Sequence, residues 1–364
     1  MKKVCILSAV NIKHMSLISI YTEELKKREI DFDIIYMDKY GEEEAFPAKN
    51  KYVFTNKINS KLPKFFRGLY YLKFISYAKS ILKRNQYDFI IVWNDVAILL
   101  FGLYLARNWK NKYCLNVRDY CYENIKMVYN IFDTAIKNAA FTTISSPGYE
   151  EFLPPANYIH LHSLNKEVLK KTTVRTELRS VDEKIRITFI GYVRFFDINK
   201  RLLDIFKNDD RFELHYYGPH SEILKQYADE KGISNAVFGG SFPVEDTFKY
   251  INKTDIINNL YGHGDINVDL ALSIKLYYGL YNYIPILVEP ETYMEKVTQK
   301  SGMGYVVESL SDDLNEKIYQ WYRSLNFENL KNKCDIELIA ISEQNEMFTQ
   351  QFEKYLTDEK MESQ

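Results

Sequence analysis

Short apolar runs alternate with amphipathic segments along this chain of 364 residues, and the alternation occurs twice. In the first half the strand-like runs are Val4–Ser8, Phe32–Tyr36, Phe89–Trp93, Tyr113–Val117 and Phe141–Ile144. The helix-like segments between them are Leu17–Lys27, Phe65–Lys83, Val96–Arg107 and Ile125–Asn138. Because strands that are apolar along their whole length are buried on both faces, this alternation predicts a parallel sheet covered by helices.

A polar and charged stretch at residues 163–184 ends this first half, and the alternation then restarts. The second set of strand-like runs is Ile185–Ile190, Phe212–Tyr217, Ala236–Gly239, Asp255–Asn258, Ile286–Val288 and Tyr305–Val307. The accompanying helix-like segments are Arg201–Lys207, Ile223–Lys231, Val244–Ile251, Ala271–Tyr281 and a last one at Ile341–Tyr355. We therefore predict an α/β fold of two Rossmann-like domains that face each other across a cleft, at 1–165 and 180–340, followed by a helix and tail at 341–364.

The composition, 46% hydrophobic and 27% charged, is that of a globular chain with enough apolar residues for two domain cores. No run reaches the roughly 18–20 apolar residues that span a bilayer. The basic residues at the start and the short apolar run after them resemble a signal peptide, but no convincing cleavage site follows. Four scattered cysteines form no CxxC pair, and reduced thiols are the simplest interpretation. We expect a cytoplasmic protein.

Basic residues are concentrated in residues 45–87, which contain ten lysines and arginines and no acidic residue. Within this window, Lys64–Ile75 mixes bases with aromatic and aliphatic side chains. Such a helix either lies on an anionic membrane at its inner face or packs on its domain with a solvated basic edge. Nucleic acid is not an expected partner, because the basic region is local and the C-terminal half is acidic.

The segment Asp255–Val288 has the pattern of a buried strand, a polar loop, an amphipathic helix and a second strand. The helix carries Lys275 beside Tyr277 and Tyr278. A lysine on an otherwise apolar helix needs a polar partner, and a helix start offers free N–H groups. The segment therefore predicts an anion site.

A second candidate for anion binding directly follows the first strand of the second half. There Gly191 and Arg194 form part of Ile-Gly-Tyr-Val-Arg, and Lys200 comes six residues later. A glycine lets the backbone approach a ligand, and two cations can neutralise a diphosphate. The alternative is an ordinary tight turn with a solvated base.

These two segments resemble the donor-binding half of GT-B glycosyltransferases of family 4, best over residues 185–305. In that family the corresponding patterns are F-[IV]-G-x-x-R…K and "…NKLYEYLAAGIPVI". The resemblance implies that Arg194, Lys200 and Lys275 hold the donor diphosphate and stabilise the leaving group, with retention at the anomeric carbon. It also implies donor contacts from glycine turns, loop residues and one helix residue: Gly191, Tyr217, Gly218, Gly240, His263, Gly264, Asn267 and Tyr278.

The sequence departs from this family in one respect. Family members carry a Glu-x7-Glu pair on the loop and helix, and the second glutamate grips the nucleotide ribose. Tyr278 stands at the place of the second glutamate, and Leu270, with Asp269 beside it, at the place of the first. Either the donor is held differently or activity has been lost.

Candidate acceptor-binding residues lie at strand ends in the first half. Arg118 and Asp119 end one strand and Glu123 follows, which resembles the "RD-[LY]-x-x-E" segment of capsule and O-antigen enzymes of family 4. Asp119 is a candidate base or orienting group for acceptor hydroxyls, although the Arg118–Asp119 pair equally fits a helix cap. Two further strand ends supply three more candidates: Asn94, which also fits a helix cap, and Asn11 with His14.

The sequence thus predicts a glycosyltransferase that moves a sugar from a nucleotide sugar to a glycan or undecaprenyl-linked acceptor in surface polysaccharide synthesis. GT-B transferases of this kind need no bound divalent ion, so the resemblance implies neither a metal nor another cofactor. Two alternatives remain: a non-catalytic GT-B partner subunit of a transferase complex, and a GT-B nucleotide-sugar epimerase.

Overall fold

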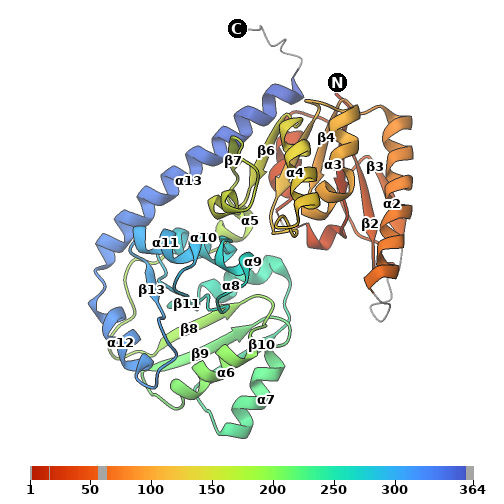
Figure 1. Cartoon of the computed structure of the whole chain (residues 1–364). Coiled ribbons are helices and arrows are strands. Elements are labelled where there is room, and N and C mark those ends of the chain that lie inside the picture. The colour runs from red at the N-terminus through yellow and green to blue at the C-terminus, as the bar shows by residue number, and fades with distance from the viewer. Residues whose placement is uncertain (1, 16, 56–63, 358–364) are drawn as a thin grey trace. The chain divides into compact units, whose positions relative to one another are not determined.

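The computed structural model describes residues 2–15, 17–55 and 64–357, and for 64–69 it describes the backbone only. The chain divides into two compact units (Figure 1). Unit 1 comprises Met1–His162 and Glu343–Gln364, and unit 2 comprises Ser163–Ser342.

Unit 1 is built on a parallel sheet of seven strands within the described residues, in the order β3-β2-β1-β4-β5-β6-β7. The strands are β1 Val4–Ser8, β2 Phe32–Asp38, β3 Asn50–Thr55, β4 Phe89–Trp93, β5 Tyr113–Val117, β6 Phe141–Ile144 and β7 Tyr158–His160. Because every pair is parallel, all carboxyl ends lie at one edge of the sheet.

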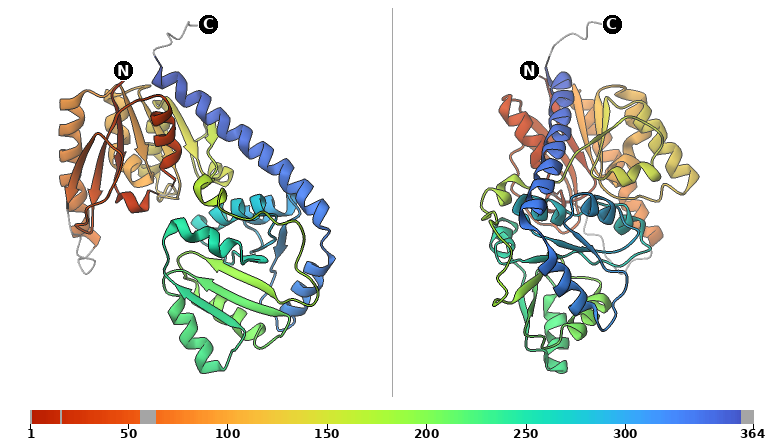
Figure 2. Two further views of the ribbon diagram at one scale, coloured as in Figure 1. Left: turned by 180° about the vertical axis from the view of Figure 1, so that it is seen from behind. Right: turned by 90° about the vertical axis from the view of Figure 1, so that its left-hand side faces the viewer.

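Helices cover both faces of this sheet. They are α1 Ser19–Lys27, α2 Lys64–Asn85, α3 Asp95–Asn108 and α4 Lys126–Lys137, with 3-10 turns at Ile12–His14 and Pro147–Glu151. On one face, α1 and the end of the last helix, α13 (Phe327–Leu356), pack on the sheet through Tyr21, Phe348 and Phe352. Figure 2 shows these two helices side by side. The apolar strand residues therefore form a core with an aromatic centre.

Unit 2 repeats the design with six strands in the order β10-β9-β8-β11-β12-β13, again all parallel. The strands are β8 Ile185–Ile190, β9 Phe212–Tyr217, β10 Ala236–Gly240, β11 Ile256–Asn258, β12 Ile286–Val288 and β13 Gly304–Val306. The helices are α5 Lys166–Leu169, α6 Phe196–Ile205, α7 Ser221–Lys231, α8 Thr247–Ile251, α9 Ile266–Asp269, α10 Ile274–Asn282, α11 Tyr293–Lys300 and α12 Leu314–Ser324, with a 3-10 turn at Val244–Asp246. One face packs α6, α7 and α12, and the other packs α5, α8, α10, α11 and the start of α13.

The polar stretch before β8 is tied to the sheet by a buried ion cluster. Asp255, with no exposed side-chain area, accepts hydrogen bonds from Arg186 Nε at 2.8 Å and from Arg175 at 2.5 Å. Arg179 Nε lies 3.7 Å from the same carboxylate. Burial opposes the charge of Asp255, but the guanidinium groups outweigh it and lower its pKa.

The expected α/β architecture of two Rossmann-like halves is confirmed. The last amphipathic segment, expected at Ile341–Tyr355, is the second half of a helix that begins at Phe327. The boundaries 1–165, 180–340 and 341–364 stay a prediction; in the structure, Phe348, Phe352 and Leu356 of the last helix pack in the core of unit 1. The predicted membrane-binding helix lies partly outside the described residues, which omit 56–63 and the side chains of 64–69.

Candidate functional site

The strand order of unit 2 changes direction between β8 and β11, since β9 and β10 lie on one side of β8 and β11 to β13 on the other. In open parallel sheets, ligands bind beyond the carboxyl ends of the strands at such a switch point. Arg194 follows β8, and Asn258 ends β11. The predicted anion-binding residues therefore lie where this topology places a ligand site.

The turn after β8 is strained. Phe195 adopts a left-handed backbone conformation with φ of 59°, which is unusual for a bulky residue. Its ring packs against Tyr261 at 5.3 Å, and the Arg194 guanidinium lies 5.4 Å from the centre of the Phe195 ring. The Arg194 side chain is exposed, so this turn presents a cation at the sheet edge.

A chain of buried hydrogen bonds holds the strained turn. Lys275 Nζ donates to the Asn258 carbonyl at 3.1 Å, and Asn258 Nδ2 donates to Asn199 Oδ1 at 3.2 Å. Asn199 Nδ2 in turn donates to the carbonyls of Arg194 and Phe195, at 3.2 and 3.0 Å. The network connects α10, β11 and α6 to the turn. Sequence reasoning missed Asn199 and Asn258, although an asparagine at the end of the apolar strand β11 was a usable signal.

Lys275, which the sequence predicts to hold the donor diphosphate, is buried in the structure. Its side chain is 3% exposed, and Nζ lies 3.5 Å from the centre of the Phe189 ring and 4.6 Å from that of Tyr261. It forms no ion pair with a carboxylate of the described residues. Burial, and next the positive charge of Arg194, hold the pKa of Lys275 well below its ordinary value. An exposed arginine and a buried lysine thus lie close enough for the charge of one to act on the other.

Lys200 lies on α6 and faces α7. Its ammonium lies 5.2 Å from the centre of the Tyr227 ring of α7, and it has no contact with Arg194 or Lys275 among the described interactions. The three predicted cations are therefore brought together only in part: Arg194 and Lys275 share one environment, and Lys200 faces a neighbouring helix.

Three predicted glycines stack at the carboxyl ends of β8, β9 and β10. Gly191 N donates to the Tyr217 carbonyl at 2.9 Å, and Gly218 N donates to the Gly240 carbonyl at 2.8 Å. Gly218 has φ of 139°, and a Cβ there would lie 1.8 Å from the Gly191 carbonyl oxygen. Only glycine fits this close approach of two turns. The strand ends thus present backbone without side chains.

The two tyrosines predicted to bind the donor are buried. The Tyr217 ring packs against that of Tyr250 with ring centres 4.2 Å apart, and its hydroxyl forms a 3.0 Å hydrogen bond with His215 Nδ1. Tyr278 is part of the core around α10, and burial raises its pKa. Both side chains pack within unit 2, so the structure gives them a role in the core.

The predicted sugar-binding loop is exposed and surrounded by acidic groups. His263 Nδ1 lies 3.3 Å from Asp269 and its Nε2 lies 3.6 Å from Glu291. Gly264 N donates to Asp269, and the Asn267 amide donates to Asp265 Oδ1 at 3.2 Å. Asp269, beside the place of the missing family glutamate, therefore orders the loop.

Glu289, at the end of β12, was not predicted and joins this loop. Its Oε1 accepts a hydrogen bond from Gly262 N at 3.0 Å, and burial raises the pKa of the carboxyl group. The only signal for Glu289 in the sequence was its place directly after an apolar strand.

In unit 1 the predicted acceptor residues Asp119 and Glu123 share the carboxyl edge of β4 and β5 with Asp95. Asp95 Oδ2 accepts hydrogen bonds from Arg118 N and Asp119 N, at 3.3 and 3.0 Å. Glu123 Oε2 accepts one from Cys121 N at 2.6 Å. Asp119 is exposed, whereas Asp95 and Glu123 are buried. One exposed and two buried carboxyl groups thus lie at this edge. Sequence reasoning did not single out Asp95.

Burial determines the protonation of this carboxyl group cluster. Burial, and next the charge of Asp119, raise the pKa of Asp95 well above its ordinary value. Burial also raises the pKa of Glu123. The Asp95 Oδ1 and Glu123 Oε1 atoms are buried without a hydrogen-bond partner. Arg118 lies with its guanidinium 5.6 Å from the centre of the Trp93 ring. The edge can therefore hold protons next to an exposed carboxylate.

The remaining acceptor candidates are held internally. Asn11 is fully buried, donates to Asp38 Oδ1 at 2.8 Å and to Glu44 Oε2 at 3.0 Å, and accepts from Lys39 N. Asn94 Oδ1 caps α3 by accepting from Ala97 N at 3.0 Å, which is the cap alternative.

His14 is the exposed member of these candidates. Its Nε2 forms a 3.0 Å hydrogen bond with the Tyr40 hydroxyl. Burial, and next the charge of Lys13, lower its pKa. His14 thus remains accessible beside the β1 edge.

Comparisons with known proteins now bear on this geometry. No family model matches the sequence, and no curated protein matches it. Among solved structures, sucrose-phosphate synthase from Thermosynechococcus elongatus superposes with a TM-score of 0.67 at 11% identity, over 97% of this chain and 100% of that one. HepE from Anabaena, solved with UDP, gives 0.66 at 11% identity over the same shares. The galactosyltransferase WaaB, which acts on the lipopolysaccharide outer core, gives 0.64 at 13% identity, over 92% and 94%.

The fold is GT-B. All three structures span both units, so the two-domain GT-B architecture expected from the sequence is confirmed. At these identities the likeness concerns the fold, and the roles of individual residues rest on the geometry described above.

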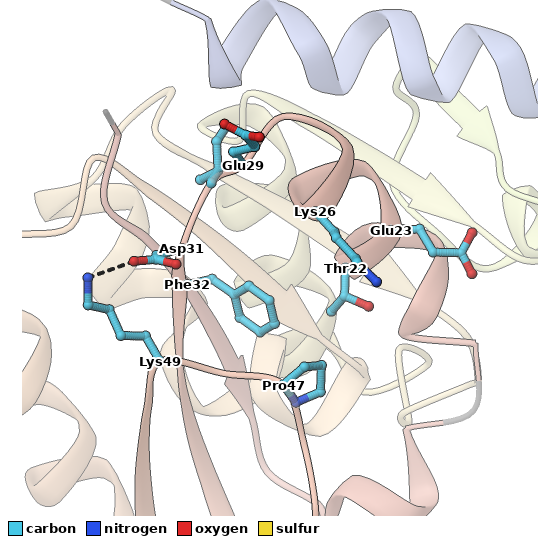
Figure 3. A pocket seen from close by; sticks show the side chains of 9 residues that line it. Thr22, Glu23, Lys26, Glu29, Asp31, Phe32, Pro47 and Lys49 are labelled. Carbon is cyan, nitrogen blue, oxygen red and sulfur yellow. Dashed lines mark hydrogen bonds and ion pairs between the residues drawn. The ribbon is translucent and has the colours of Figure 1, made fainter.

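One other feature of this GT-B chain lies away from the sheet edges just described. A cavity of about 400 Å³ opens beside the end of α1 and the start of β2 (Figure 3). Its floor is apolar, and its rim carries charges of both signs, including the Lys49–Asp31 ion pair at 2.6 Å. Since it lies at the amino end of β2, we do not assign the nucleotide to it.

Neither a metal cluster nor a membrane-spanning helix occurs within residues 2–15, 17–55 and 64–357. Among them, no three His, Cys, Asp or Glu side chains are arranged to hold a metal ion. Within the same residues, no helix is long and apolar enough to cross a membrane.

Proposed function

We propose that this chain is a nucleotide-sugar-dependent glycosyltransferase that transfers a sugar to a glycan or undecaprenyl-linked acceptor in surface polysaccharide synthesis. The observation that carries the proposal is the strained Arg194–Phe195 turn at the switch point of unit 2, held by the Lys275–Asn258–Asn199 hydrogen bonds. Strain of this kind persists only where surrounding contacts enforce it, and it clusters at ligand sites.

In this proposal the donor diphosphate lies beside Arg194 and the backbone of Gly191 and Gly218. A planar guanidinium binds phosphate oxygens through paired, charge-assisted hydrogen bonds. The same group stabilises the negative charge that develops on the leaving diphosphate, and retention at the anomeric carbon is the stereochemical expectation. No metal is needed for this step, because cationic side chains supply the charge.

On the acceptor side, the proposal assigns the exposed Asp119 to the acceptor hydroxyl. Asp95 holds the backbone N–H groups of Arg118 and Asp119 and so fixes the direction of this carboxylate. A carboxylate within hydrogen-bond reach can orient or deprotonate a sugar hydroxyl. The basic window at 45–87 is proposed to lie on an anionic membrane that carries the lipid-linked acceptor.

Two other functions are each supported by a separate observation, and the test described below distinguishes them. A nucleotide-sugar epimerase is supported by one fold neighbour, a putative UDP-N-acetylglucosamine 2-epimerase from Listeria monocytogenes, with a TM-score of 0.60 at 10% identity. A non-catalytic partner subunit is supported by the missing glutamate pair and by the burial of Lys275.

The first test is binding of UDP, GDP, CMP and dTDP and of their common sugars, measured by thermal shift. A ligand at about 100 times its Kd stabilises the folded protein by about 2.7 kcal/mol. We expect one nucleotide class to bind and Arg194→Ala to weaken that binding at least ~10-fold, since a charge-assisted phosphate contact is lost. Arg201→Ala is the matched control, because Arg201 pairs with the exposed Asp312 on another side of α6.

The outcomes separate the alternatives. An equal loss of nucleotide affinity in Lys200→Ala would mean that Lys200 leaves Tyr227 and joins the site. Absence of binding by every nucleotide would favour the partner subunit, and conversion of a nucleotide sugar without any acceptor would favour the epimerase.

A further inference from the structure

The groups that surround the Lys275 amine have opposite effects: some stabilise the charged ammonium form, and others stabilise the neutral amine. The Phe189 and Tyr261 rings and the Asn258 carbonyl favour the ammonium form through cation–π contacts and a hydrogen bond. Burial at 3% exposure and the neighbouring Arg194 guanidinium favour the neutral amine. Because the opposing effects act on the same atom, a small change in the surrounding charge can change its protonation.

Among the described residues, no negatively charged group acts on Lys275 to settle this balance. From the turn after β8 it meets Arg194, and from the loop after β11 it meets Tyr261. On its own helix Tyr278 follows at i+3, about one turn away. Burial raises the pKa of both tyrosines, so both remain neutral hydroxyls near neutral pH. Arg194 is therefore the charged group that acts on Lys275 within the described residues.

We propose that Lys275 gains a proton when a diphosphate binds beside Arg194, being a neutral amine before binding and an ammonium ion afterwards. The anion neutralises Arg194 and adds negative charge close to the amine, which removes the repulsion and makes the ammonium form favourable. The proton comes from the solvent, so the protein takes up at most one proton for each diphosphate that binds. This inference rests on the proposed function, because it takes the diphosphate site at Arg194 as given.

The proposal gives Lys275 a positioning role in addition to its hydrogen bond to Asn258. Once protonated, its ammonium donates more strongly to the Asn258 carbonyl, at the start of the hydrogen bonds that hold the Arg194–Phe195 turn. Diphosphate binding and the order of this turn are thereby coupled. Release of the diphosphate returns the proton to solvent.

The test is calorimetric titration of the full chain with UDP or GDP, whichever binds, in two buffers of equal pH and different ionisation enthalpy. Measurements start at about pH 8, where the terminal phosphate of the nucleotide, with a pKa of about 6, is already ionised. We expect wild type to take up between about 0.5 and 1 proton per nucleotide. Lys275→Met should take up none and still bind, whereas Arg201→Ala should behave as wild type.

A second measurement uses wild type alone and does not depend on how the variant folds. Proton uptake requires that affinity fall with rising pH, by up to ~10-fold per pH unit between the pKa values of the free and bound states. Binding without proton uptake in wild type, or equal uptake in wild type and Lys275→Met, would overturn the inference and leave the nucleotide site in place. If inorganic pyrophosphate and all four nucleotides of the first test (UDP, GDP, CMP and dTDP) fail to bind, the proposed function itself falls, and this inference with it.

Discussion

At the scale of single residues, the carboxyl group of Asp95 is held where its charged form is disfavoured. It is 3% exposed, Asp119 and Glu123 lie near it, and its raised pKa follows from burial first and Asp119 second. The folded state therefore binds this proton more tightly than the unfolded chain, whose aspartates titrate near pH ~3.9. The contribution of Asp95 to stability therefore falls as pH rises from about 4 to the pKa of folded Asp95.

We expect Asp95→Asn to remove this pH dependence. The asparagine carbonyl can still accept from Arg118 N and Asp119 N, as Asp95 Oδ2 does. Its stability relative to wild type should rise by up to about 1.4 kcal/mol per pH unit above about pH 4, until the pKa of folded Asp95 is passed. Urea denaturation between pH 4 and 8 measures this, with the fully exposed Asp210→Asn as control. Parallel curves of unfolding free energy against pH for wild type and Asp95→Asn would contradict this prediction.

Residue types in the sequence indicated which groups gather at the strand ends, but not which way they face. Arg194 and Asp119 are exposed at those ends, whereas Gly218 is buried. Asn11 and Lys275 are equally polar, yet neighbouring groups that are remote in sequence bury them: Asp38 and Glu44 for Asn11, Phe189 for Lys275. Such partners are set by tertiary packing, which no local pattern reports.

At the scale of elements, the polar stretch before β8 is joined to β11 by one carboxylate. Asp255→Ala would leave Arg175, Arg179 and Arg186 without the buried charge that they share. Removing one partner of a buried ion pair costs about 3–5 kcal/mol. We expect a loss of this size in the free energy of unfolding.

Asp312→Ala is the matched control for this prediction. Asp312 pairs with Arg201 but its side chain is 92% exposed, so its loss should cost no more than about 1 kcal/mol. Chemical denaturation of both variants compares the two. Similar costs at the two sites would mean that the cluster does not anchor the stretch.

Elements with a continuous apolar signal were predicted closely, and the edge strands β3 and β7 of the first sheet were not. β1, β4, β5, β6, β8, β9 and β12 begin and end where the apolar runs do. β3 and β7 lie at the edges of the first sheet and are only partly buried, so their sequences carry a weak apolar signal. The start of α13 had a usable signal in Asn326, whose side chain accepts from Asn329 N at 2.9 Å.

At the scale of the whole molecule, the core of unit 1 depends on aromatic residues near both ends of the chain. Phe352 is fully buried, with ring centres 5.5 Å from Tyr21, 6.1 Å from Phe89 and 6.2 Å from Phe141. Truncation of a buried phenylalanine costs about 3–5 kcal/mol. We expect Phe352→Ala to lower the stability of unit 1 by this amount.

The exposed Met347 of the same helix supplies the control. Its side chain is 60% exposed, so Met347→Ala should change stability by no more than about 0.5 kcal/mol. Hydrogen exchange of amides in β1 and β4 reports on unit 1 directly. Faster exchange confined to unit 2 in Phe352→Ala would contradict the assignment of this helix end to the first core.

The division of α13 between the units also sets an order for biosynthesis. Unit 2 is one uninterrupted stretch, so all of its contacts are available once residue 342 has left the ribosome. Unit 1 starts the chain, yet its sheet keeps one apolar face open until the last turns of α13 are translated. The half that is made first is thus completed last, and until then its exposed face is a natural target for chaperones.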